Sequence, residues 1–345
     1  MTEAALEALL AAVRSNCLLS DARYAQEQSL CNYLLAMREY YRWEHRLPLD
    51  AEPPRTEVLR WVAQREADWE AVPADAQWTP LPLDDGVDPF RVDLVNAELV
   101  PAGLVYGAGI GRFGKPHFFL GELARRERRG AVEILECGRE LARDIDAAPA
   151  VLQDATIYLR REALERWLWL RAEVWESREN AGAMGAALAA HGFAEDRAGA
   201  LARMAEGERE TLILHELGEH AAGLRLGEAW ERLMEQLSDA RAELAARAVR
   251  DLLADCLVTL PTLIARGAAP SLHFWFANFT GLRRMLFPRL GSARTAWVDS
   301  GSTAALEDAI AVGRDHWERI ALSMAAEGPA AAKRIANGDP SATLG

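Results

Sequence analysis

The first part of the chain carries hydrophobic residues at helical spacing. Tyr33, Met37 and Tyr40 are separated by three or four positions, and a second series of this kind begins at Val58, after a pair of prolines. Positions three and four apart share one face of a helix, so both stretches predict amphipathic helices. Residues from about 71 to 100 are instead rich in proline and aspartate, which is typical of a linker or of an irregular segment that lines the rest of the protein.

The periodicity changes after residue 101, where short runs of β-forming residues alternate with glycine-containing turns. Three such runs lie at 104–106, 117–120 and 132–135. Runs of this length between turn residues predict strands that follow one another in an antiparallel meander. Helical, alanine-rich composition returns at residue 161 and continues to about 335.

The chain is therefore expected to contain four regions. These are an N-terminal helical region at 1–85, a small β-rich region at 86–160, a helical domain at 161–335 and a flexible tail at 336–345. The predicted fold class is mainly α, within the α+β class. We expect a helical bundle-like domain with a small antiparallel β-meander inserted around 102–160.

Composition narrows the classes of function. The 345 residues include 52 acidic and 39 basic ones, for a net charge of −13. This balance argues against binding to nucleic acid or to an anionic membrane surface, since both rely on clustered cations. No apolar run approaches the roughly 18 residues that a membrane span requires, and the N-terminus lacks the basic start of a signal peptide. The four cysteines show no C-x-x-C spacing, so we expect reduced thiols in a cytoplasmic protein.

A glycine-rich segment at 109–114 reads Gly-Ile-Gly-Arg-Phe-Gly and satisfies the G-x-G-x-x-G pattern of dinucleotide-binding loops. That function requires a helix directly after the loop, because the helix N-terminus holds the pyrophosphate. β-forming residues follow instead at 117–120. The segment therefore predicts a hairpin in which glycines permit positive φ. The alternative is a glycine flap over a site, with Arg112 or Lys115 contacting an anionic substrate.

The strongest chemical signal lies at 215–220, His-Glu-Leu-Gly-Glu-His, where four metal-ligating side chains occupy little more than one turn of predicted helix. At about 100° per residue, Glu219 lies about 40°, Glu216 about 100° and His220 about 140° from His215. The pairs His215/Glu219 and Glu216/His220 are four apart and suited to bind one ion together. The two histidines are five apart, so they converge only if the helix widens into a π-type turn.

This helix resembles that of the zincin-like metallopeptidases, whose H-E-x-x-H motif carries two zinc-binding histidines and a general-base glutamate. The additional residue before the second histidine makes it similar to the H-E-x-x-x-H motif of the dipeptidyl peptidase III family. In that family a downstream helix supplies a third ligand. Residues 238–243, Ser-Asp-Ala-Arg-Ala-Glu, resemble that helix at their last three positions and place an aspartate where the ligating glutamate falls.

The resemblance implies a zinc site held by His215, His220 and Asp239, with an open position for water. Glu216 would be the general base that takes a proton from this water. Glu243 would be an alternative ligand or a carboxylate that orients a histidine. The implied activity is zinc-dependent hydrolysis of an amide or peptide-like bond, in a small-molecule or peptide substrate.

Two other interpretations use the same residues. Helical bundles hold pairs of iron or manganese ions with carboxylate-rich, histidine-poor ligand sets. The candidate ligands of such a set are His215, Glu216, Glu219, His220, Asp239 and Glu243. Asp251 and Asp255, four apart, extend an acidic stripe, although a salt-bridged face with Arg247 and Arg250 is preferred there. The third interpretation is a non-catalytic helical interaction protein. The sequence predicts no oligomeric state.

Overall fold

The computed structural model describes residues 1–345 except 26–28, 84–85, 112–113 and 178–181. The chain divides into two compact units, Met1–Leu170 and Arg171–Gly345. It is mainly α with a β part, as predicted. The regions expected at 1–85 and 86–160 together fall within the first unit. The division between the units lies ten residues after the expected boundary at 160, inside helix α5 (Arg161–Glu176).

The first unit begins with helices whose starts are marked in the sequence. Thr2 accepts a hydrogen bond from the backbone N–H of Ala5, and Ser29 accepts one from Asn32, so each caps the helix that follows it. Pro54 precedes the third helix, where a missing N–H costs nothing. The four helices before the sheet are α1 (Glu3–Tyr24), α2 (Leu30–Glu44), α3 (Arg55–Glu70) and α4 (Val92–Leu99).

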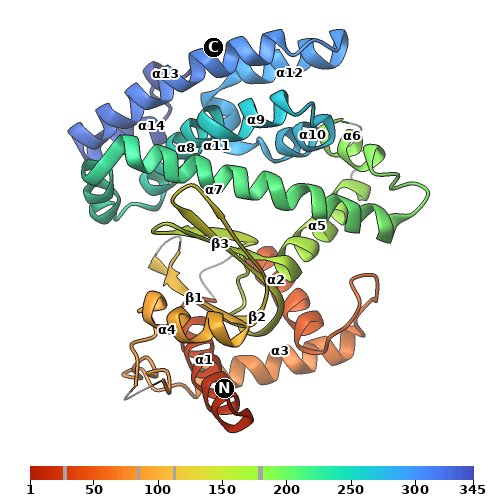
Figure 1. Cartoon of the computed structure of the whole chain (residues 1–345), viewed down its shortest axis with the longest axis vertical. Helices are drawn as coiled ribbons and strands as arrows, with labels where there is room; N and C mark the ends of the chain where they lie inside the picture. Colours follow the sequence, from red (N-terminus) through yellow and green to blue (C-terminus); the bar gives the residue numbers. More distant parts are fainter. Residues whose placement is uncertain (26–28, 84–85, 112–113, 178–181) are drawn as a thin grey trace. The chain divides into compact units, whose positions relative to one another are not determined.

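Five strands form one sheet in the order β1-β2-β3-β5-β4, of which Figure 1 labels β1, β2 and β3. Their bounds are β1 (Leu104–Ile110), β2 (Pro116–Arg129), β3 (Val132–Arg143), β4 (Ala150–Gln153) and β5 (Thr156–Arg160). Three of the four pairings are antiparallel, but β3 and β5 are parallel. The sheet is therefore mixed and not the antiparallel meander that the sequence predicts. The burial of the two last strands accounts for the difference: β5 is almost wholly buried and takes the inner position, while the half-exposed β4 takes the edge.

The glycine-rich segment lies in the connection from β1 to β2, which pair antiparallel from Ile110 opposite Pro116 onward. A strand and not a helix follows the glycines, so the predicted hairpin is confirmed and the helix that a dinucleotide site requires is replaced by β2. Arg112 lies outside the described residues. Lys115 is buried and pairs with acidic side chains of its own unit, so it does not serve as an exposed flap residue.

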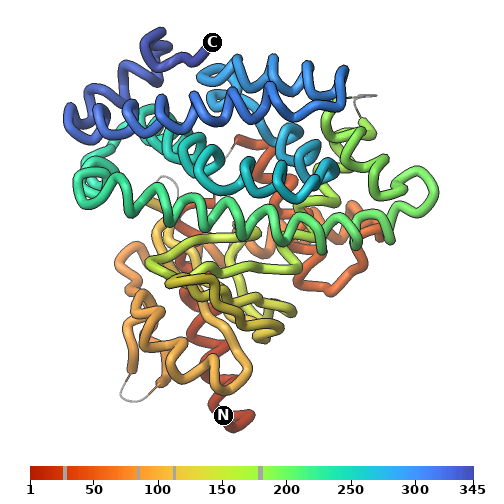
Figure 2. Tube along the Cα trace, turned by 45° about the horizontal axis from the view of Figure 1, so that its top comes forward, coloured from red at the N-terminus to blue at the C-terminus, as the bar shows by residue number. Residues whose placement is uncertain are grey.

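The second unit is made of helices around a large hydrophobic core. Its longest helix is the 40-residue α7, which Figure 2 shows as a long green tube. Gly227 interrupts the helical geometry of α7 with a positive φ of 62°. The other elements are α6 (Gly182–Ala190), α7 (Arg197–Gln236), α8 (Ala240–Ala254), a π-helical segment (Asp255–Thr259), α9 (Leu260–Ala265), α10 (Ala269–Asn278), α11 (Gly281–Leu286), α12 (Pro288–Ser300), α13 (Ala304–Glu327) and α14 (Pro329–Ala336).

Helix α8 lies at the centre of this unit, in contact with α7, α13 and α14. Ala242, Ala245, Ala246 and Ala254 of this helix are fully buried, and the rings of Phe287 and Trp317 pack in the same core. Residues 336–345, expected to form a flexible tail, make backbone hydrogen bonds from Leu344 to Leu286 and from Arg289 to Leu344. Ala342 is fully buried, so this segment packs on the unit. None of the helices among the described residues is long and apolar enough to cross a membrane.

Candidate metal centre

The predicted metal-binding helix is part of α7. Asp196 caps the start of α7 by accepting a hydrogen bond from the N–H of Gly199. The helix keeps α-helical geometry throughout 211–220. The π-type widening that would bring His215 and His220 together is therefore not present in this segment. A π-helical segment occurs instead at Asp255–Thr259, directly after α8, and such segments are frequent at functional sites.

Gly218 allows α7 and α8 to approach closely. A Cβ atom at this position would lie 2.5 Å from the carbonyl oxygen of Ala254 and 2.9 Å from its carbonyl carbon. Only glycine fits against backbone at this distance. The consequence is that His215 and Glu219, which lie before and after Gly218, face Asp251 near the end of α8 and Asp255 directly after it.

His215 is the centre of this contact. Its Nδ1 lies 2.8 Å from Oδ1 of Asp255, and its Nε2 lies 3.6 Å from Oε1 of Glu219. Asp251 completes a group of three side chains, with His215 and Glu219, whose ligand atoms all lie within 4.8 Å of one another. One imidazole and two carboxylates therefore converge from two helices.

Two guanidinium groups flank this group. Arg250 on α8 donates to Oε1 of Glu219 at 2.6 Å, and Arg283 on α11 lies 3.4 Å from Oδ2 of Asp255. Arg250 is also 3.7 Å from Asp251. The cluster thus has three acidic side chains and two guanidinium groups. Its net charge therefore depends on whether the imidazole of His215 is protonated.

The pKa values reflect this balance. Burial would raise the pKa of Glu219, but its hydrogen bond with His215 and the charge of Arg250 lower it to about 2. Burial opposes a charged His215, yet the carboxylate of Asp255 outweighs it and raises the pKa of this imidazole well above its ordinary value. Burial raises the pKa of Asp251, with Glu219 adding to the effect. The group therefore favours a cation at its centre, which is either a proton on His215 or a metal ion in its place.

The structure distributes the predicted site residues as follows. His215 and Glu219 lie in the group, and Glu216 is buried beside them in sequence. His220 is half-buried and outside the group. Asp239 is exposed and caps α8 by accepting a hydrogen bond from the N–H of Ala242.

Glu243, the remaining predicted ligand, binds Arg247 on its own helix at 2.8 Å and is also outside the group. The acidic residues that do face His215 are Asp251 and Asp255, which the sequence analysis assigned to a salt-bridged face. The signal in the sequence that could have identified them is their spacing of four, because it places two carboxylates on one side of a helix. Arg250 does form the salt bridges expected of such a face.

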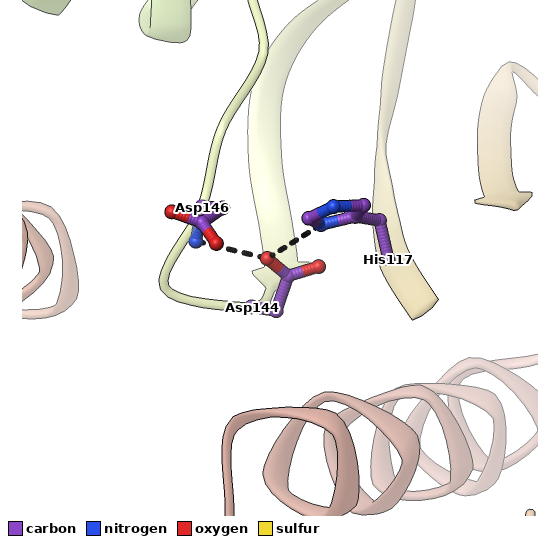
Figure 3. A group of neighbouring side chains, drawn as sticks. All are labelled: His117, Asp144 and Asp146. Carbon is purple, nitrogen blue, oxygen red and sulfur yellow. Dashed lines mark hydrogen bonds and ion pairs between the residues drawn. The ribbon is translucent and has the colours of Figure 1, made fainter. Parts of the chain in front are cut away.

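The described residues contain a second histidine-carboxylate group in the first unit, shown in Figure 3. Nδ1 of His117 lies 3.3 Å from Asp144, which also accepts hydrogen bonds from the N–H groups of Phe118 and Asp146. The ammonium group of Lys115 lies 2.7 Å from Asp146 and 3.9 Å from Asp144. Lys115 pairs with both carboxylates and also with Asp21 on α1, and we interpret the group as a buried ion network that joins α1, β2 and the segment after β3.

Comparison with known proteins gives two family matches. The N-terminal domain of a family of unknown function (DUF6866) matches residues 8–160, and the C-terminal domain of the same family matches residues 165–337. No curated protein and no solved structure matches the chain.

Proposed function

The chain belongs to the DUF6866 family of unknown function, and we propose that its C-terminal domain binds one divalent transition-metal ion and uses it in hydrolysis. The proposed ligands are Nε2 of His215 and the carboxylates of Glu219 and Asp251. Three protein ligands leave positions open for water and substrate, as in catalytic metal sites. A bound divalent ion lowers the pKa of water and polarises a carbonyl, which is the chemistry that hydrolysis of an amide or related bond requires.

The observation that carries this proposal is the hydrogen bond between Asp255 and Nδ1 of His215. Metal-binding histidines commonly donate their other ring N–H to a carboxylate, which fixes the tautomer and the ring orientation. Here the bond holds the proton on Nδ1 and directs Nε2 toward Glu219 and Asp251. Arg283 binds the far oxygen of Asp255 and holds that carboxylate in position.

The donor set favours manganese or iron over zinc. The zinc expectation required two histidines, and the group contains one imidazole with two carboxylates. Oxygen-rich sets suit harder ions such as Mn²⁺, whereas zinc sites favour nitrogen and sulfur ligands. Glu219 is then itself a ligand. The proposed ion is iron or manganese, as in the second interpretation of the sequence. The three ligands suit a single ion.

Glu216 keeps the role of general base in this proposal. It is buried on α7 next to His215, and its charge acts on Arg250, the cation that binds Glu219. Glu216→Gln should therefore retain bound metal and lose turnover of amide and ester test substrates. Loss of the metal together with activity would assign Glu216 to the ligand set instead.

Metal analysis of tag-free protein tests the site directly. We expect about one Mn²⁺ or Fe²⁺ per chain by mass spectrometry, and its loss in His215→Ala and Asp251→Asn. Asp239→Asn is the matched control, because it makes the same change at an exposed helix cap where asparagine serves as well as aspartate. If wild-type protein dialysed against Mn²⁺ retains none, or if Asp251→Asn retains as much as wild type, the group is an ion network that holds α7 to α8.

Metal binding should also compete with protons. His215 must lose its proton to bind through Nε2, and its pKa is raised by Asp255. The affinity for Mn²⁺ should therefore fall about tenfold per pH unit below this pKa, with release of about one proton. Calorimetry in two buffers of different ionisation enthalpy measures the released proton. An affinity that does not change between pH 6 and 8 would contradict imidazole ligation.

A further inference from the structure

The first unit contains a cavity of about 340 Å³ that is separate from both histidine groups. Helices α1, α2 and α3 and the end of β3 supply its walls. Polar and aromatic side chains make up most of the lining. The residues are Arg14, Cys17, Leu18, Asp21, Tyr40, Trp43, Glu44, Arg46, Arg65, Trp69, Leu141, Ala142 and Arg143. A cavity of this size lies at the lower end of the range for small-molecule sites, about 300–1,000 Å³.

The walls carry more positive than negative charge, although the whole chain has a net charge of −13. Four arginines line the cavity against two acidic residues, Asp21 and Glu44. Glu44 is paired with Arg65 at 2.7 Å, and Asp21 is paired with the ammonium group of Lys115 at 3.3 Å. Arg46 lies 3.3 Å from Glu162 and Arg143 lies 3.7 Å from Glu140. Among the described residues, Arg14 is therefore the wall arginine without a carboxylate partner.

The guanidinium group of Arg166 on α5 interacts with that of Arg143 and with the carboxylates of Glu140, Glu162 and Glu39. Arg166 is buried, and burial together with the charge of Arg143 lowers its pKa to about 10. A guanidinium group loses affinity for its proton only where positive charge is crowded and poorly solvated. An anion near Arg143 would relieve this repulsion.

Buried N–H donors on three wall residues lack hydrogen-bond partners among the described residues, although Nη1 of Arg143 lies 3.7 Å from a carboxylate oxygen of Glu140. These donors are Nε and Nη1 of Arg143, Nε1 of Trp43 and Nε1 of Trp69. The three residues are 3%, 8% and 5% exposed. An unsatisfied buried donor costs about 1–3 kcal/mol, so native proteins seldom leave several in one place without a ligand or water to accept from them.

The same residues form flat surfaces. The guanidinium carbon of Arg143 lies 5.4 Å from the ring centroid of Tyr40 and 5.2 Å from that of Trp43. Stacking of this kind fixes the plane of the guanidinium group. A fixed guanidinium plane is suited to two parallel hydrogen bonds with a carboxylate or a phosphate.

We propose that this cavity binds a small organic anion through a carboxylate or phosphate group. Arg143 and the two indole N–H groups donate to its oxygens, and Arg14 supplies further positive charge at the wall. Arg14 is suited to this role because, among the described residues, its only hydrogen bond is to the carbonyl oxygen of Leu141. The aromatic rings contact the remainder of the anion. This site is independent of the proposed metal centre, which lies in the other unit.

Calorimetric titration of the full chain tests the proposal, with sodium benzoate as the carboxylate probe and inorganic phosphate as the phosphate probe. We expect at least one of them to bind at about one per chain, and the stronger of the two identifies the class of anion. Arg14→Gln should weaken this binding about tenfold or more and Trp69→Phe about fivefold, since a charge-assisted hydrogen bond contributes at least about 1.5 kcal/mol and a neutral one about 1 kcal/mol.

Arg128→Gln is the control, because Arg128 is an exposed arginine on β2 that does not line the cavity. Trp69→Phe keeps a smaller aromatic ring and removes the N–H donor, so it tests the indole donor separately from the charge of the arginine. The proposal is overturned if neither anion binds at millimolar concentration. Equal weakening by Arg128→Gln would overturn it as well, because binding would then reflect general surface charge.

Discussion

Gly218→Ala tests whether the contact between α7 and α8 depends on the absence of a side chain. The new Cβ atom would lie 2.5 Å from the carbonyl oxygen of Ala254, 2.9 Å from its carbonyl carbon and 3.2 Å from its Cα. All three are backbone atoms, so no side chain can rotate to make room. The two helices must move apart, and His215 must move away from Asp255.

The change in stability caused by Gly218→Ala is the sum of two opposing effects. Forcing a methyl group into a packed interior costs about 1–3 kcal/mol, while replacing glycine by alanine inside a helix gains about 1 kcal/mol. Gly223→Ala makes the same replacement five residues later on the same helix, where no atom lies within 4 Å of the new Cβ. It should therefore show only the gain.

Thermal unfolding of the two variants provides the assay. We expect Gly223→Ala to raise the midpoint and Gly218→Ala to be less stable than Gly223→Ala by about 1–3 kcal/mol, a separation of roughly 2–12 °C for a unit of this size. Gly218→Ala should also lose affinity for Mn²⁺, because it separates the ligands on α7 from Asp251. If the two variants unfold at the same temperature, the close approach at Ala254 does not constrain the helices and the argument for the site geometry is refuted.

Two further predictions concern buried and capping carboxyl groups. Burial raises the pKa of Glu208 from 4.5 to about 7, although Ser271 donates a hydrogen bond to it. Because this pKa is higher in the folded state than in the unfolded state, the contribution of protonated Glu208 to folding stability is fully present below about pH 4.5. This contribution is lost as the pH rises through 7. Glu208→Gln should therefore stabilise the protein at pH 8 by about 3 kcal/mol at most, and should change the urea midpoint less at pH 5; equal effects at both values would contradict a raised pKa. Asp239→Ala should cost about 1 kcal/mol through loss of the helix cap and leave the content of bound metal unchanged, whereas loss of the metal would restore Asp239 as a ligand.

Helices were predictable wherever local signals agreed. Ser29 and Pro54 stand directly before α2 and α3, and the apolar positions between them recur at helical spacing. Each of these signals acts within a few residues, so the sequence contains all the information that decides the element. The hairpin between β1 and β2 was predictable for the same reason, because glycines and flanking β-forming residues are local.

The order of the strands was not predictable in this way. The three runs identified in the sequence correspond to β1, β2 and β3, whereas β4 and β5 were not identified as separate strands. The order depends on which strand gains more from burial beside β3, and β5 is the more buried of the two. That gain is set by packing against residues distant in sequence.

The sequence by itself determined the helical character of this protein and the pairing of His215 with Glu219, because residues four apart on a helix always share a face. Only the tertiary structure decided which acidic residues join them. Asp251 and Asp255 are 36 and 40 residues beyond His215 in the chain, and they reach it because Gly218 lets α7 pack directly on the backbone of Ala254. Contacts between helices depend on shape complementarity along their whole length, which no short motif contains.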